Sequence, residues 1–113
     1  GTDILSVRQA RALGAQGVVD RIPAGARVYV TLDIDGFCPS IAPGTGTPSH
    51  GGFLYYEVLE MLQAIAKRHE VVGMDLVEVA PDYDATQSTS ILAAQILLNF
   101  LGFIFEARRV AAG

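Results

Sequence analysis

The feature that most constrains this chain is an apolar strand that ends in two carboxylates and runs into a long Gly- and Pro-rich loop. Residues Val28 to Leu32 favour a strand, and Asp33 and Asp35 follow them, one residue apart. In parallel α/β proteins, ligands collect beyond the carboxyl ends of the strands. Alternate strand residues point to one side, so both carboxylates can converge on a single cation. Charges in such an apolar setting need compensation, and a metal ion is the simplest compensator.

The loop that follows, Gly36 to Gly52, has five glycines and three prolines in 17 residues. A loop of this length without secondary structure is usually functional or disordered, and its prolines favour a fixed shape. The run from Gly44 to Thr47 is only a weak match to a phosphate-binding loop, because the Lys-Ser/Thr ending is missing. Near the end of the loop, His50 is a candidate substrate contact.

Hydrophobic periodicity predicts a strand–helix–strand unit around this loop. An amphipathic helix is expected from Leu54 to about His69, and a second apolar strand from Glu70 to Val79. Two strands joined by such a crossover run parallel, which predicts an α/β fold. Their carboxyl ends then share one edge of the sheet, which places Glu78 on the side of Asp33 and Asp35.

Two further helices are expected at the ends of the chain. The first runs from about Ile4 to about Ala15, with Thr2 or Asp3 as its cap. The second runs from about Ser90 to about Arg108 and is apolar on most of its surface. Such a helix must be covered by the sheet and by a neighbouring helix or subunit.

Composition narrows the classes of partner. The chain has 113 residues, half of them hydrophobic, and fits one small domain. A net charge of -4 without a block of Lys or Arg argues against nucleic acid and anionic membranes. The single cysteine, Cys38, excludes an internal disulfide and fits the cytoplasm. No signal peptide is visible, and the longest apolar run is shorter than the ~20 residues of a membrane span.

Residue chemistry alone leaves two interpretations open at each candidate site. Asp33 and Asp35 suit a hard cation such as Mg²⁺, Ca²⁺ or Mn²⁺, but Asp also stabilises turns. Glu78 can pair with an Arg of the chain or receive a cationic substrate group, for which a guanidinium is a natural match. We expect His69 to be a solvated helix terminus and Cys38 to be an unreactive loop thiol. No catalytic residue is assigned.

Combined, the motifs of this chain resemble the ureohydrolases, the family of arginase and agmatinase. The resemblance rests on LDIDGFCP at 32–39, APGTGTP at 42–48, the Gly51-Gly52 pair and VEVAP at 77–81. The Gly-Thr-Gly-Thr-Pro run and the loop PDYD at 81–84 look closer to agmatinase than to arginase. The resemblance implies part of a three-layer αβα fold with a parallel sheet.

The same resemblance implies an activity and roles for three residues. The complete enzyme would hydrolyse a guanidino compound such as agmatine to urea and an amine, with two Mn²⁺ ions per site. By position, Asp33 matches a carboxylate that bridges the metals, and Asp35 matches a ligand of the second metal. Glu78 matches the carboxylate that holds the guanidinium.

Two departures from the family pattern limit this hypothesis. Cys38 stands where the family usually has Asp, and no Asp-x-His-x-Asp run, the source of most other metal ligands, is present. Residues 1–113 are therefore interpreted as a single segment, the C-terminal portion of a ureohydrolase domain, inactive alone. We expect a homo-oligomer or a missing N-terminal segment. The alternatives are a non-catalytic remnant or oligomerisation module, and a small divalent-cation-binding α/β module.

Overall fold

The computed structural model describes residues 1–113, the whole chain. Three helices, two strands and two single 3-10 turns follow one another. In chain order they are α1 (Val7–Val19), β1 (Arg27–Asp33), η1 (Ile34–Gly36), α2 (Tyr55–Arg68), β2 (Glu70–Val77), η2 (Pro81–Tyr83) and α3 (Ser88–Ala111).

The two strands form a parallel sheet, and α2 is the crossover between them. In the register, Thr31 lies opposite Asp75 and Asp33 lies opposite Val77. The predicted strand–helix–strand unit is thus confirmed. Because the strands are parallel, the residues that follow Asp33 and Val77 leave the sheet at the same edge.

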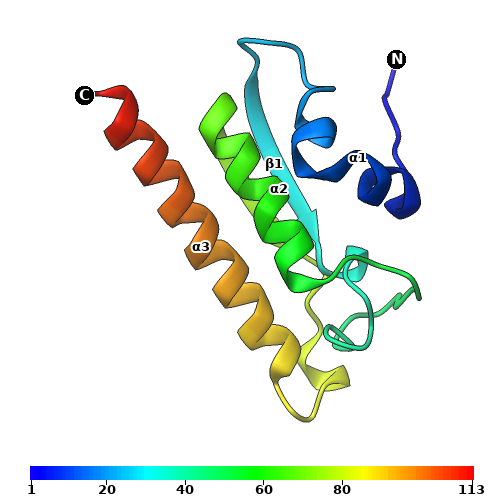
Figure 1. Ribbon diagram of the computed structural model, residues 1–113. Helices are drawn as coiled ribbons and strands as arrows, with labels where there is room; N and C mark the ends of the chain where they lie inside the picture. The colour runs from blue at the N-terminus through cyan, green and yellow to red at the C-terminus, as the bar shows by residue number, and fades with distance from the viewer.

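The helices form one layer against one face of the sheet. In Figure 1, α2 lies in front of the sheet and runs alongside β1, with α1 on one side of it and α3 on the other. Val28, Val30 and Leu32 of β1 are partly buried and pack against the core, whereas Tyr29 and Thr31 are exposed. The core is formed mainly by apolar residues of α2, α3 and the start of the loop (Ile34, Phe37, Ala42, Val58, Leu59, Leu62, Ala66, Val71, Leu92, Ala93, Ile96, Phe100 and Ile104).

Coverage of the sheet on both faces, expected from the apolar character of β1, is not provided by this chain. The face that carries Tyr29 and Thr31 has no helix against it. On this open face, Tyr29 Oη and Thr31 Oγ1 donate hydrogen bonds to Asp75 at 2.9 and 2.5 Å. The polar groups on this uncovered face thus form hydrogen bonds with one another.

The predicted element ends need correction at both termini. Helix α1 begins after Ser6, whose side chain and that of Gln9 form a reciprocal capping box, so Thr2 and Asp3 are not its cap. It continues past the predicted end through a kink at Gly14, where φ is 71°. Helix α3 follows Gln87, which has a φ of 62° and makes no side-chain cap.

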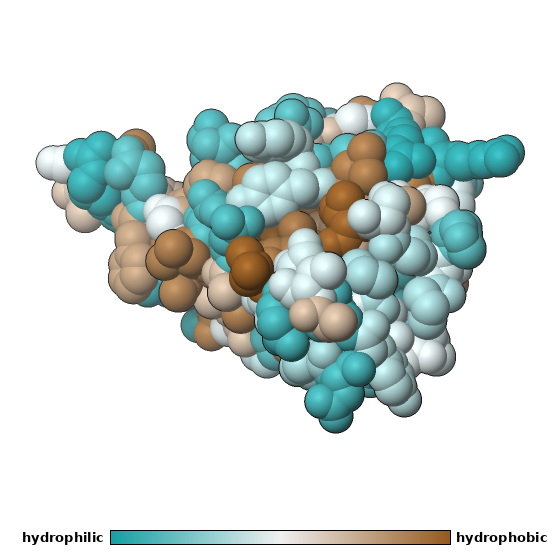
Figure 2. Space-filling model, turned by 90° about the horizontal axis from the view of Figure 1, so that it is seen from below, coloured by the Kyte–Doolittle hydropathy of each residue, from teal (hydrophilic) through white to brown (hydrophobic).

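Much of the apolar surface of α3 remains exposed. Leu98 is 71% exposed and Phe105 is 62% exposed, although Ile96 and Phe100 on the other side of the helix are fully buried. Figure 2 shows hydrophobic surface on the side of the molecule where α3 lies. By length and composition alone, α3 is the one helix apolar enough to cross a membrane, a test that core helices also pass.

Candidate metal centre

Asp33 and Asp35 meet through a tight turn at the end of β1. Asp33 is the last strand residue, whereas Asp35 lies within η1. The backbone N–H of Asp35 donates to Asp33 Oδ1 at 3.0 Å, so the two carboxylates lie on an Asx-type turn. Because Asp35 lies in η1, the alternation of strand side chains does not apply to this pair, and their convergence on one cation stays a prediction.

A loop hydroxyl fixes the second carboxylate. Thr47 Oγ1 donates to Asp35 Oδ2 at 2.6 Å. Asp33 Oδ2 and Asp35 Oδ1 accept no hydrogen bond from the protein, so each carboxylate keeps one oxygen free. Thr47 is not predictable from the sequence, because nothing in a Gly- and Pro-rich loop indicates which hydroxyl will fold back onto the strand end.

The electrostatics of the pair favour a cation. Asp33 is exposed, but partial desolvation by its neighbours raises its pKa, and the Asp35 carboxylate raises this pKa further, against the opposing effect of the Asp35 N–H. Two hard oxygen donors with uncompensated charge suit Mn²⁺, Mg²⁺ or Ca²⁺. Nowhere in the chain, however, do three His, Cys, Asp or Glu side chains lie close enough to hold a metal ion. The residues fit a divalent cation as part of a site.

Glu78 lies at the predicted edge of the sheet, exposed to solvent and with a positive φ. It is the first residue beyond β2, next to Val77, which lies opposite Asp33. Glu78 is exposed, and β2 ends at Val77 and not at the predicted Val79. Its φ of 70° is rare for a residue with a side chain and costs of order 1 kcal/mol. Such strain is common where function fixes a side chain.

The two histidines lie in different surroundings. His50 is exposed in the loop and joins no cluster with the carboxylates. His69 was predicted to be solvated, and this prediction is wrong: its exposed fraction is 8%, and neither ring nitrogen has a hydrogen-bond partner. It follows α2 directly and precedes β2, so it lies at the opposite end of the strands from Asp33.

The two ends of the Gly36–Gly52 loop are joined by backbone hydrogen bonds. Phe53 N donates to Gly36 O, and Cys38 N donates to Phe53 O, both at 2.9 Å. Ser40 Oγ donates to Cys38 Sγ at 3.0 Å, and this bond, with the nearby Arg11 charge, lowers the pKa of the thiol. No side-chain base forms a hydrogen bond with Cys38, so the structure gives no reason to assign the thiol as a nucleophile.

The middle of the loop is anchored on the first turn of α3 and on the segment that follows β2. Gly44 N donates to Thr89 Oγ1 at 2.8 Å, and Ala80 N donates to Gly44 O at 2.7 Å. A Cβ on Gly44 would lie 2.9 Å from both Asp84 Cβ and Thr89 Oγ1. Only glycine therefore permits this close approach.

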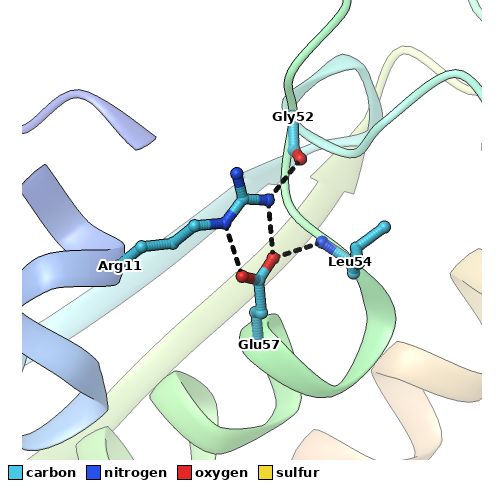
Figure 3. Close-up of polar contacts among 4 residues, drawn as sticks. All are labelled: Arg11, Gly52, Leu54 and Glu57. Carbon is cyan, nitrogen blue, oxygen red and sulfur yellow. Dashed lines mark hydrogen bonds and ion pairs between the residues drawn. The ribbon is translucent and has the colours of Figure 1, made fainter. Parts of the chain in front are cut away.

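The end of the loop is anchored on α1. Arg11 Nε donates to Glu57 Oε1 at 2.6 Å, and Arg11 Nη2 donates to Glu57 Oε2 and to Gly52 O, both at 3.0 Å (Figure 3). Glu57 in turn accepts from Leu54 N at 2.7 Å at the start of α2. The Arg11 hydrogen bond lowers the pKa of Glu57, so this carboxylate is ionised at neutral pH.

Comparison with known proteins identifies relatives of this chain and of its fold. Residues 1–102 match the arginase family. The agmatinase of Halalkalibacterium halodurans is 49% identical over 79 residues, which are 69% of this chain and 27% of that protein.

Solved structures show the same fold. The proclavaminate amidino hydrolase of Streptomyces clavuligerus superposes with a TM-score of 0.86 at 39% identity, over 95% of this chain and 36% of that one. A hypothetical agmatinase from Burkholderia thailandensis gives 0.85 at 34% identity, over 100% of this chain and 36% of that one. The predicted arginase-like α/β fold is confirmed. The chain thus spans about a third of these structures, and it belongs to the arginase family.

Proposed function

We propose that this chain is the C-terminal, agmatinase-like portion of a ureohydrolase, and that it contributes two carboxylates to a binuclear Mn²⁺ centre. The observation that carries the proposal is the pair Asp33 and Asp35, each with one oxygen free of protein hydrogen bonds. The pair lies at the carboxyl edge of a parallel sheet, where α/β proteins bind their ligands.

Each named residue then has one task. Asp33 and Asp35 supply negative charge and oxygen ligands, while Thr47 fixes the rotation of the Asp35 carboxylate through its hydrogen bond. Glu78, at the same edge, accepts N–H bonds from the planar guanidinium of the substrate. When bound, the metal ions supply a nucleophile derived from water near neutral pH and stabilise developing negative charge. The products are urea and an amine.

The proposed substrate is agmatine, because two of the similar proteins described above are named agmatinases. A guanidinobutyrase is also similar, at 44% identity over 77 residues, so the guanidino group is the shared element. The remaining metal ligands would come from sequence outside these 113 residues. We further propose a cytoplasmic homo-oligomer, without nucleic acid or membrane partners.

A chimera tests this proposal. These 113 residues replace the matching segment of the H. halodurans agmatinase, and urea release is measured with agmatine, arginine and 4-guanidinobutyrate after loading with Mn²⁺. We expect urea from agmatine, and a loss of at least about a hundredfold in kcat/KM for Asp33→Asn, because a metal ligand is weakened. The isolated chain with Mn²⁺ should release no urea.

The matched control is Asp82→Asn, which changes an exposed carboxylate in η2 that has no hydrogen-bond partner in the chain. This variant should keep the activity of the chimera. A folded chimera that binds Mn²⁺ and yet releases no urea from any of the three substrates would contradict the proposal. Urea production by the isolated chain would contradict the proposal that the metal centre needs ligands from outside these 113 residues.

A further inference from the structure

We propose that Arg11 is a positioning residue for the metal centre. Arg11 holds the closing residue of the Gly36–Gly52 loop, and the loop in turn holds the Thr47 hydroxyl on Asp35. The inference rests on the proposed function in one respect, namely that Asp35 is a metal ligand. It assigns a task to a residue on α1 that touches neither metal nor substrate.

The first link is the set of bonds around the guanidinium. Arg11 donates from Nε and Nη2 to both oxygens of Glu57, and Nη2 also donates to the carbonyl of Gly52 (Figure 3). Glu57 accepts from Leu54 N as well, which fixes the carboxylate on the first turn of α2. The guanidinium therefore joins three segments of the chain: α1, the end of the loop and the start of α2.

The second link is the close approach of the two loop ends. A Cβ on Gly52 would lie 2.5 Å from Phe37 C and 2.6 Å from Phe37 O, so Gly52 rests directly on the backbone that follows Asp35. The neighbouring pair of bonds, Phe53 N to Gly36 O and Cys38 N to Phe53 O, closes the loop at this point. Displacement of Gly52 would therefore open the loop next to η1.

The third link is the position of Thr47 between two anchors. Gly44 is held on Thr89 near the start of α3, and Gly52 is held on Arg11 of α1. Thr47 lies between them and spans back to Asp35 Oδ2 at 2.6 Å. With one anchor released, the hydroxyl loses its fixed position, and the Asp35 carboxylate can rotate away from the orientation in which its other oxygen is free.

The Arg11–Glu57 ion pair is too exposed to contribute much to the stability of the fold. The side chains of Arg11 and Glu57 are 42% and 32% exposed, and exposed ion pairs of this kind contribute little to stability. Its distinctive feature is the third bond, to Gly52 O, which requires the planar fork of Arg. Lysine would keep the charge but lose the fork. The arrangement therefore suits positioning better than stabilisation.

The experiment uses the isolated chain with Mn²⁺ alone as the probe. Paramagnetic broadening of the backbone amides from Asp33 to Gly36 reports weak binding of the ion, and a titration gives its midpoint. For Arg11→Gln and Arg11→Lys we expect the midpoint to rise roughly tenfold, the usual effect of losing a group that orients a metal ligand.

The matched control is Arg21→Gln. Arg21 makes a two-bond pair with Asp3 at 2.6 and 2.8 Å with comparable exposure, but it makes no contact with the loop. This variant should leave the Mn²⁺ midpoint unchanged. Thermal unfolding of both glutamine variants should differ little, because each loses one exposed ion pair.

A double variant tests the route through the loop. Thr47→Val removes the hydroxyl that bonds Asp35, and Arg11→Gln combined with Thr47→Val should bind Mn²⁺ no more weakly than Thr47→Val alone. Additive losses would overturn the proposed route. An Arg11→Gln variant that melts earlier but keeps the wild-type Mn²⁺ midpoint would show a merely structural role and overturn the inference.

Hydrogen exchange without metal separates this inference from the proposed function. Arg11→Gln should speed exchange of the Phe53 and Cys38 amides, which close the loop, and Arg21→Gln should not. If wild-type amides near Asp33 show no effect of Mn²⁺, the proposed metal role fails. Exchange at the Phe53 and Cys38 amides then tests separately whether Arg11 holds the end of the loop. Unchanged exchange rates in Arg11→Gln would overturn that role.

Discussion

At the scale of single residues, Asp84 is the carboxylate most strongly held by the chain. It accepts hydrogen bonds from the backbone N–H groups and hydroxyls of both Thr86 and Thr89, at 2.6 to 3.1 Å. The Thr86 hydroxyl, followed by the Thr89 donors, lowers the pKa of Asp84 to about 2. The same Thr89 hydroxyl accepts from Gly44 N, so Asp84 connects the start of α3 to the Gly36–Gly52 loop.

This pKa predicts an acid-dependent loss of stability. The folded-state pKa of about 2 lies below the ordinary 3.8, so the folded chain binds this proton less tightly than the unfolded chain. The stabilisation is present above about pH 4 and is lost as the pH falls towards 2. Urea unfolding of Asp84→Asn should show a lower midpoint at pH 7 and a smaller further decrease between pH 4 and 2.

Asp82→Asn is the control, because Asp82 is exposed on the preceding turn and accepts no hydrogen bond. Its unfolding midpoint should follow that of the wild type over the whole range. A wild-type slope that persists in Asp84→Asn would show that another carboxylate is responsible.

At the scale of elements, His69 marks the junction of α2 and β2 as a weak point of the fold. Its imidazole is buried with both nitrogens unpaired, and a buried polar group without partners costs free energy. His69→Leu keeps a side chain of similar size and removes the polar atoms. We expect the free energy of unfolding to rise by about 1 kcal/mol, measured by urea denaturation at pH 7.

His50→Leu is the comparison, since His50 is exposed in the loop and should change stability by less than about 0.5 kcal/mol. A decrease in stability for His69→Leu would show that the imidazole makes a stabilising contact in solution, and would contradict an unpaired His69.

The strand–helix–strand unit could be predicted from sequence because its signal is local. Apolar periodicity defines β1, α2 and β2, and the parallel topology follows from the crossover. The ends of the helices and strands were predicted less accurately. The cap of α1 at Ser6 competes with two equally suitable residues upstream, and the kink at Gly14 lets the helix continue where glycine suggested an end.

Only the location of the candidate site residues at one edge of the sheet could be predicted, because strand topology determines it. Asp33, Asp35 and Glu78 follow strands that share one edge, so their common location was predictable. The contacts of Thr47 and Arg11 join segments 12 and 41 residues apart in the chain, and no periodicity encodes them. The exposure of Glu78 depends on where β2 ends, which sequence patterns locate poorly.

At the scale of the whole molecule, the chain is a layer of helices on a sheet with one open face. Tyr29 on that face is 60% exposed, and its ring lies over Gly73, where a Cβ would come within 2.6 Å of it. The solved relatives are nearly three times as long, since this chain covers 36% of them. The chain spans about a third of the length of these relatives, and its two-stranded sheet depends on packing against α2 and α3 for stability.

The outer side of α3 gives the last prediction. Ile91, Leu98, Leu101 and Phe105 recur at helical spacing and are 40 to 71% exposed, so they form one apolar stripe. An uncovered stripe of this kind drives association. We expect the isolated chain to self-associate through α3, with a sedimentation coefficient that rises with concentration.

Leu98→Glu should weaken this association by at least roughly tenfold, because it replaces buried apolar area, worth about 1.5–3 kcal/mol per Leu, with a charge. Ile4→Glu is the control: Ile4 is 79% exposed but lies before α1, outside the stripe, and this variant should associate like the wild type. Equal weakening by both variants would indicate general repulsion from added negative charge on a chain of net charge -4. Association that is unchanged by Leu98→Glu would contradict a contact through α3. The open face of the sheet would then be the remaining candidate, with Tyr29→Glu as the variant that tests it.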